Sequence, residues 1–144
     1  MQIPLKIQNI AGGDRLVLTF MIKVSRFART VNAIIDTGSP RSILCNADFR
    51  LMNMPHDILV DAEQKVDIGS QKGIVLYKIN KPINLIMLNK EKKPFEIEYP
   101  IFIAPSHQTP TILGVDFLTK NNYVLHYDAV NKIGYLEDVP LTTN

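Results

Sequence analysis

The stretch Ala33-Ile34-Ile35-Asp36-Thr37-Gly38-Ser39 decides how the rest of the chain is interpreted. Its apolar residues favour a strand, which ends at an aspartate, and the glycine two positions later favours a turn. The pattern therefore predicts a carboxylate exposed at the end of a strand. A plain turn that closes a strand has the same pattern, so a functional interpretation needs support from elsewhere in the sequence.

Support comes near the end of the chain, in Ile112-Leu113-Gly114-Val115-Asp116-Phe117-Leu118. Two bulky apolar residues and a glycine precede a segment that is expected to be helical as far as Lys120. Asp favours helix starts, so Asp116 is interpreted as a cap or opening residue of this helix, rather than as a second catalytic carboxylate.

Alternating apolar residues between these motifs predict a mostly β chain. A strand over 16–24 and a return strand over 30–35 form a hairpin that leads to Asp36. A second, projecting hairpin has strands 65–68 and 74–79 around the tip Gly69-Ser70-Gln71-Lys72-Gly73. Further strands are expected over 83–88, 95–103, 123–127 and 132–136, and Asn46 is expected to cap a short helix over 47–52.

Composition limits the possible classes of function. The 144 residues are 46% hydrophobic and 21% charged, which predicts one globular domain over residues 1–144. A net charge of +2 makes a nucleic acid an unexpected partner. One cysteine, Cys45, and three scattered histidines (His56, His107 and His126) have no zinc-ligand spacing, so neither metal nor cofactor is expected.

The apolar segments are also too short to predict a membrane span, since the longest covers only 16–24. The first residues lack the pattern of a secretory signal. We therefore expect a protein that does not associate with membranes and that is cytoplasmic or released from a longer precursor.

The Asp-Thr-Gly-Ser motif, the glycine-bearing hairpin and the Ile-Leu-Gly-Val-Asp-Phe-Leu motif, in this order, resemble a retropepsin-like aspartic protease over roughly residues 15–137. The resemblance implies a single-domain closed β fold with one or two short helices, active as a twofold homodimer. It also implies that terminal strands help to join the subunits, for which 3–7 and 133–136 are the apolar candidates.

The resemblance also implies roles for individual residues. Asp36 would be the catalytic aspartate, and Thr37 would tie the two catalytic loops together. Gly38 would let the backbone approach closely, and the hydroxyl of Ser39 could bond to the aspartate. The residues packed behind the catalytic loop would be Ile112, Leu113 and Gly114, and the tip from Gly69 to Gly73 would belong to a flap that closes over the substrate.

Aspartic proteolysis needs two adjacent carboxylates, one as general base toward water and one as general acid toward the peptide carbonyl. The chain has one such motif, so Asp36 would meet Asp36 of a second copy. The predicted function is therefore an aspartic endopeptidase that acts on a peptide or protein substrate. The alternative is a non-catalytic β-fold module for dimerisation or peptide binding, because a fold alone does not prove activity.

Overall fold

The computed structural model describes residues 1–68, 70–108 and 110–140, without the side chains of 61–64. The strands are β1 (Gln2–Ile10), β2 (Gly13–Val24), β3 (Phe27–Ile35), β4 (Ile43–Leu44), β5 (Leu59–Ile68), β6 (Gln71–Ile79), β7 (Ile83–Leu88), β8 (Pro94–Glu98), β9 (Phe102–Ile103), β10 (Ile112–Leu113), β11 (Tyr123–Asp128) and β12 (Ile133–Asp138). The helices are α1 (Asn46–Met52), the 3-10 helix η1 (His56–Ile58) and α2 (Val115–Lys120). The predicted mostly β class is confirmed.

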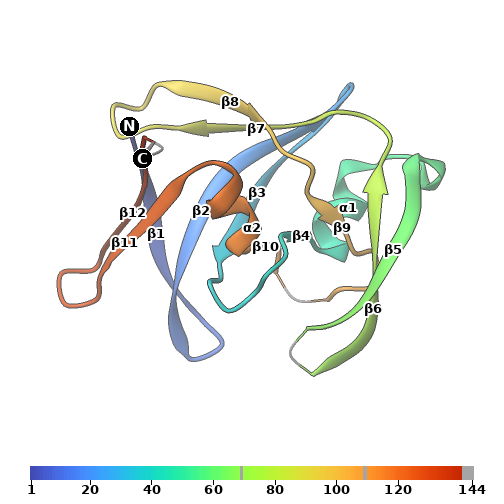
Figure 1. The fold of residues 1–144 in the computed structure, drawn as a ribbon, viewed down its shortest axis with the longest axis horizontal. Helices are drawn as coiled ribbons and strands as arrows, with labels where there is room; N and C mark the ends of the chain where they lie inside the picture. Colours follow the sequence, from blue (N-terminus) through green and yellow to red (C-terminus); the bar gives the residue numbers. More distant parts are fainter. Residues whose placement is uncertain (69, 109, 141–144) are drawn as a thin grey trace.

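The strands form one strongly curved sheet in the order β11-β12-β1-β2-β3-β10-β4-β9-β6-β5, with the β7–β8 pair attached to β2 (Figure 1). Most neighbours are antiparallel, but β10 runs parallel to β3 and β9 runs parallel to β4. As a result β10, from the last third of the chain, lies between β3 and β4, which come from the first third. This insertion places the two sequence motifs side by side.

The β2–β3 hairpin shows why alternation is a good strand signal. Leu18, Phe20, Ile22 and Val24 are at most 2% exposed and share one face of β2. The predicted return strand begins three residues earlier than expected, at Phe27, because the turn needs only two residues after Val24. Ser25 there has φ of 53°, a left-handed conformation typical of tight hairpin turns.

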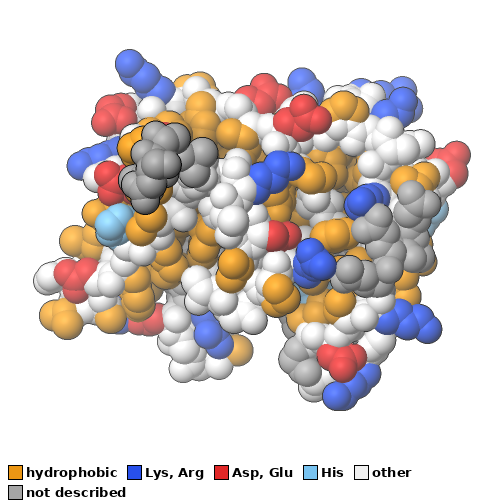
Figure 2. Space-filling model, in the orientation of Figure 1, with side chains coloured by type: hydrophobic (Ala, Val, Ile, Leu, Met, Phe, Trp, Pro, Cys, Tyr) orange, Lys and Arg blue, Asp and Glu red, His pale blue; other side chains and the backbone are white. Residues whose placement is uncertain are grey.

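The main hydrophobic core lies inside the curved sheet and includes the three fully buried phenylalanines Phe20, Phe49 and Phe117. A smaller cluster, with Ile74 and Leu76, lies under the β5–β6 hairpin. Charged side chains of both signs are mixed over the face of the molecule in Figure 2. The described residues contain no helix that is long and apolar enough to cross a bilayer.

Three local predictions need correction. Asn46 is the first residue of α1 rather than its cap; Cys45 holds the cap position, and the Asn46 side-chain amide donates to the Pro105 carbonyl instead. The strand predicted over 95–103 is two strands, β8 and β9, separated by a bend at Tyr99-Pro100-Ile101. In the second hairpin β6 begins at Gln71, so the tip is shorter than predicted, and Gly69 lies outside the described residues.

The terminal segments that were candidates for joining two subunits pair with each other inside one chain. Ile3 lies opposite Leu136, and Leu5 lies opposite Gly134. Both Ile3 and Leu136 are fully buried in the core of their own chain. The apolar character that suggested an interface is therefore explained by packing within the chain.

Candidate active site

The candidate active site is the loop over 36–42, which leaves β3 and is held against β10. The backbone N–H of Asp36 donates to the carbonyl of Leu113 at 3.0 Å, and the N–H of Ile34 donates to the carbonyl of Thr111 at 2.9 Å. At the far end of the loop, Ile43 of β4 pairs with Ile112. Both ends of the loop are thus fixed to one short buried strand.

Within the loop, the carboxylate of Asp36 is oriented by its own backbone. The N–H of Gly38 donates to Asp36 Oδ1 at 2.9 Å, and the N–H of Ser39 donates to the Asp36 carbonyl at 3.1 Å. The residue is partly exposed, so solvent reaches the acid. A Cβ on residue 38 would lie 3.2 Å from Oδ1, a tight contact that favours glycine at this position.

Thr37 and Ser39, the two other residues of the motif, do not make the bonds that the resemblance implied within a single chain. Thr37 is exposed at the surface of the single chain. The hydroxyl of Ser39 donates to the carbonyl of Arg41 at 2.8 Å, and this bond tightens the loop rather than reaching the carboxylate as the resemblance implied.

Gly114 lies directly behind the loop, next to the buried residues Ile112 and Leu113. A Cβ on residue 114 would lie 2.4 Å from the carbonyl oxygen of Ser39 and 2.5 Å from that of Arg41. The adjacent N–H of Val115 donates to the same Ser39 carbonyl at 2.9 Å. Only a residue without a side chain leaves room for this approach of two backbone segments.

The buried Ser42 and the half-buried Asp116 complete the support, and sequence reasoning missed Ser42. Asp116 accepts from Ser42 Oγ at 2.6 Å through Oδ1 and from the Ser42 N–H at 3.1 Å through Oδ2. Ser42 Oγ in turn accepts from the N–H of Gly114 at 2.9 Å. Gly114 holds the cap position of α2, so Asp116 does not cap the helix; it opens the helix instead, as the second residue of the first turn, where its Oδ1 accepts from the N–H of Phe117 at 2.8 Å.

Tyr99 is close to this pair. Burial, chiefly, raises the pKa of the Tyr99 hydroxyl far above its ordinary value, so the side chain stays neutral near Ser42 and Asp116. A buried serine carries no distinctive sequence signal, which is why this part of the site could not be found before the fold was known.

The β5–β6 hairpin projects beside the residues that follow β9, up to Gln108 (Figure 1). Near its tip, Gln71 Oε1 accepts from the N–H of Gln108 at 3.1 Å, and the N–H of Gly73 donates to Asp67 Oδ1 at 3.0 Å. Gly73 has φ of 64°, which favours glycine. The predicted hairpin is present, with Ser70, Gln71, Lys72 and Gly73 near its end; its role as a flap stays a prediction.

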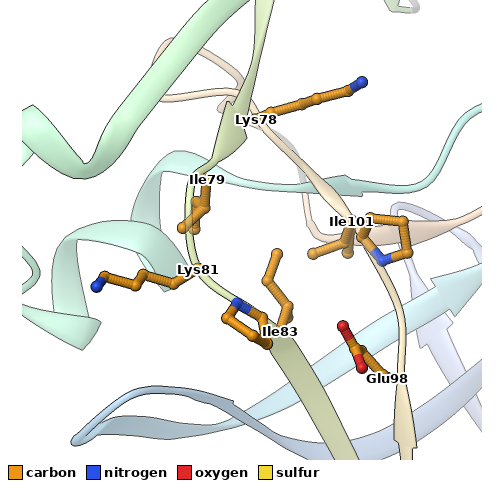
Figure 3. A pocket seen from close by; sticks show the side chains of 8 residues that line it. Lys78, Ile79, Lys81, Ile83, Glu98 and Ile101 are labelled. Carbon is orange, nitrogen blue, oxygen red and sulfur yellow. The ribbon is translucent and has the colours of Figure 1, made fainter.

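A small cavity of about 90 Å³ lies between the end of β6, the start of β7 and the segment after β8 (Figure 3). It is lined by Lys78, Lys81 and Glu98 among others, but the two lysine side chains point away from its centre in Figure 3. The cavity therefore lacks the converging charges of an anion site. Within the described residues, no three His, Cys, Asp or Glu side chains are grouped as a metal ion would need.

Comparison with known proteins supports the fold through structure alone. No protein family profile matches the sequence, and no curated protein is similar to it in sequence. A solved retropepsin-like aspartic protease from Rickettsia conorii is similar in structure, with a TM-score of 0.55 and 13% sequence identity over 94% of this chain and 90% of that chain. The predicted retropepsin-like fold is therefore confirmed, whereas this identity leaves the activity open.

Proposed function

We propose that the protein is an aspartic endopeptidase whose active site forms when two copies each contribute Asp36. The observation that carries the proposal is the position of this carboxylate within a retropepsin-like fold. It lies at the end of β3, with its backbone held by Leu113 and its Oδ1 held by the N–H of Gly38. A partly exposed acid on so constrained a loop is suited to a task that needs fixed geometry.

The chemistry needs a pair of carboxylates that share one proton. Two carboxyl groups in contact cannot both ionise easily, because their negative charges would repel each other. One Asp36 therefore stays protonated while the other is ionised. The ionised acid takes a proton from water, which attacks the peptide carbonyl, and the protonated acid donates to the carbonyl oxygen. When the tetrahedral intermediate collapses, the acid that took the proton from water passes it to the leaving nitrogen, and the ionised acid takes a proton from a hydroxyl of the intermediate, so the pair again shares one proton.

The other residues of the motif have supporting roles in this proposal. Thr37, exposed beside Asp36, would bond across the twofold axis and hold the two loops together. The β5–β6 hairpin would close over a bound peptide, and release of the bond between Gln71 and Gln108 would let it move. Gly114 and Asp116 would not contact the substrate but would fix the shape of the loop over 36–42.

The decisive experiment is an assay of the purified chain on a mixed peptide library, with and without a statine-type inhibitor. Asp36→Asn keeps the shape of the side chain but cannot accept the proton from water, so cleavage should fall to background. Asp57→Asn, at an exposed position in η1, is the matched control and should cleave like the wild type.

Full activity in Asp36→Asn would contradict the mechanism. Wild-type chains that bind peptides from the library but cleave none would instead favour the alternative, a peptide-binding module.

A further inference from the structure

The loop over 36–42 carries a positive charge that the proposed chemistry does not use. Arg41 follows Asp36 by five positions and precedes the buried Ser42. Its backbone carbonyl accepts the bond from the Ser39 hydroxyl, so the loop fixes the point from which the side chain extends. Arg41 is partly exposed, as is Asp36. One short loop therefore presents both a cation and the candidate catalytic acid.

The guanidinium of Arg41 lies over an aromatic ring. Its Cζ is 5.8 Å from the centre of the Phe102 ring, within the range of a cation–π contact. Phe102 belongs to β9 and packs on the small cluster under the β5–β6 hairpin, which includes Ile74 and Leu76 of β6. The charge thus lies between the loop that carries Asp36 and the base of this hairpin.

Arg41 makes no ion pair with any carboxylate whose side chain the structure describes. Arg29 shows the contrast, because its Nε donates to Asp48 Oδ1 at 3.0 Å. A guanidinium with one face on a ring still has its N–H groups in the plane, and these match a carboxylate with two parallel hydrogen bonds. The Arg41 side chain is therefore suited to bind an acidic group from outside the chain.

The order of the strands indicates how far this charge lies from the candidate acid. Asp36 follows β3, and β10, β4 and β9 come next across the sheet, as the centre of Figure 1 shows. Neighbouring strands are about 4.8 Å apart, so β4, into which Arg41 leads, is roughly 10 Å from β3, and β9 is roughly 14 Å from it. An extended peptide advances about 3.3 Å per residue. A distance of this size therefore corresponds to three or four residues of an extended substrate.

We infer that Arg41 selects substrates with Asp or Glu three or four residues from the scissile bond. The inference rests on the proposed function, because it names the substrate class of that same site. A peptide whose scissile carbonyl lies at Asp36, and which runs toward the β5–β6 hairpin, brings its side chains past Arg41. The carboxylate of the peptide bonds to the guanidinium, and the Phe102 ring holds the guanidinium in place.

The twofold arrangement of the proposed active site makes this selection two-sided. Each copy supplies one Arg41, so a peptide that crosses the pair of Asp36 side chains meets one guanidinium on either side of the scissile bond. Acidic residues on the two sides should therefore favour cleavage independently, and a peptide with both should be cleaved best.

Matched peptides test the inference, based on a sequence that the library shows to be cleaved. They differ only in Glu, Gln or Lys at the third and fourth positions on either side of the scissile bond. In the wild type, kcat/KM should be about fivefold higher for Glu than for Gln on each side, as expected for a partly exposed ion pair. The Lys peptides should be cleaved more slowly than the Gln peptides, and a high salt concentration should reduce both differences.

Variants of Arg41 assign the preference to this side chain. Arg41→Gln should cleave Glu and Gln peptides about equally, and Arg41→Glu should prefer Lys. Arg50→Gln, at an exposed position in α1, is the matched control and should keep the wild-type preference. Equal cleavage of Glu and Gln peptides by the wild type would overturn the inference. So would an Arg41→Gln variant that slows all peptides by one factor, since Arg41 would then only shape the loop.

The two proposals can fail separately. Binding of the library peptides to Asp36→Asn, which should hold substrates without cleaving them, measures the selection without turnover. If the wild type cleaves nothing, but Asp36→Asn prefers acidic peptides and loses this preference when Arg41→Gln is added, the selection stands and the protease is rejected. Cleavage by the wild type without any preference for Glu over Gln would have the opposite meaning, and a chain that neither cleaves nor binds peptides would reject both.

Discussion

Gly114 is the position where a single added atom should do most damage. Gly114→Ala would place a Cβ within 2.5 Å of two backbone carbonyls, neither of which can rotate away. We expect a loss of about 3 kcal/mol in the free energy of unfolding and a strong loss of cleavage, because the loop must shift. Urea denaturation and the peptide assay would measure both.

Gly13→Ala is the control for this prediction, since a Cβ there meets no atom within 4 Å. If Gly114→Ala is as stable and active as Gly13→Ala, the close packing of residue 114 against the loop over 36–42 matters neither for stability nor for cleavage.

Ser42 and Asp116 should act as one unit. Ser42→Ala leaves the carboxylate of Asp116 and the N–H of Gly114 without their buried partner, which should cost about 2 kcal/mol of stability. Asp116→Asn should cost a similar amount, because an amide nitrogen would face a donor. The double variant should lose less than the sum of the two, and chemical denaturation of all three variants measures this coupling.

Additive losses would show that the two residues act independently. Asp116→Asn should also keep measurable cleavage, since the carboxylate positions the loop from behind and lies outside the proposed pair of acids.

His107, in the segment after β9, should make stability depend on pH. This side chain is fully buried, and burial lowers its pKa below the ordinary value. The unfolded chain then binds a proton near pH 6.5 while the folded chain does not, so stability is fully present above this pH and is lost as the pH falls. The slope for one proton is at most about 1.4 kcal/mol per pH unit.

Urea unfolding at several values between pH 7.5 and 5 would reveal this slope. It should become smaller in His107→Gln and stay unchanged in His56→Gln, where the replaced histidine is exposed. An equal slope in wild type and His107→Gln would assign the effect to other groups.

The individual strands and site residues show how much of the structure could be predicted from the sequence. Long strands such as β2 and β3 were predictable, because alternation records which face is buried. The two-residue strands β4 and β10 were not, since each exists only through partners far away in the sequence, and β9 was predicted only as the end of one long strand with β8. In the site, Asp36, Gly38 and Gly114 could be recognised in the sequence from their residue types. Ser42 could not, because its role depends on the bond from the N–H of Gly114, which the fold places beside it.

Activity should depend on protein concentration if each copy supplies one acid. Specific activity should fall when the protein is diluted below the dimer dissociation constant, because the pair of carboxylates is lost with the partner. A dilution series with parallel sedimentation measurements would test this. Constant specific activity in a sample shown to be monomeric would contradict the shared site.

Mixing experiments provide an independent measurement of the same property. In a nine-to-one mixture of Asp36→Asn with wild-type chains, random pairing leaves about one wild-type chain in ten with a wild-type partner. Activity per wild-type chain should therefore fall about tenfold. Activity that stays proportional to the amount of wild-type chain would mean that a single copy suffices.

The insertion of β10 between β3 and β4 also has a consequence for how the protein folds. The bond from the Asp36 N–H to the Leu113 carbonyl joins residues about half the chain apart, whereas the β2–β3 hairpin needs only neighbouring residues. Contacts between distant residues form slowly, because a long loop must close before they contribute any stability. During synthesis the β2–β3 hairpin can form early, but the loop over 36–42 cannot be held in place until β10 has left the ribosome. The candidate active site can therefore be assembled only late in synthesis.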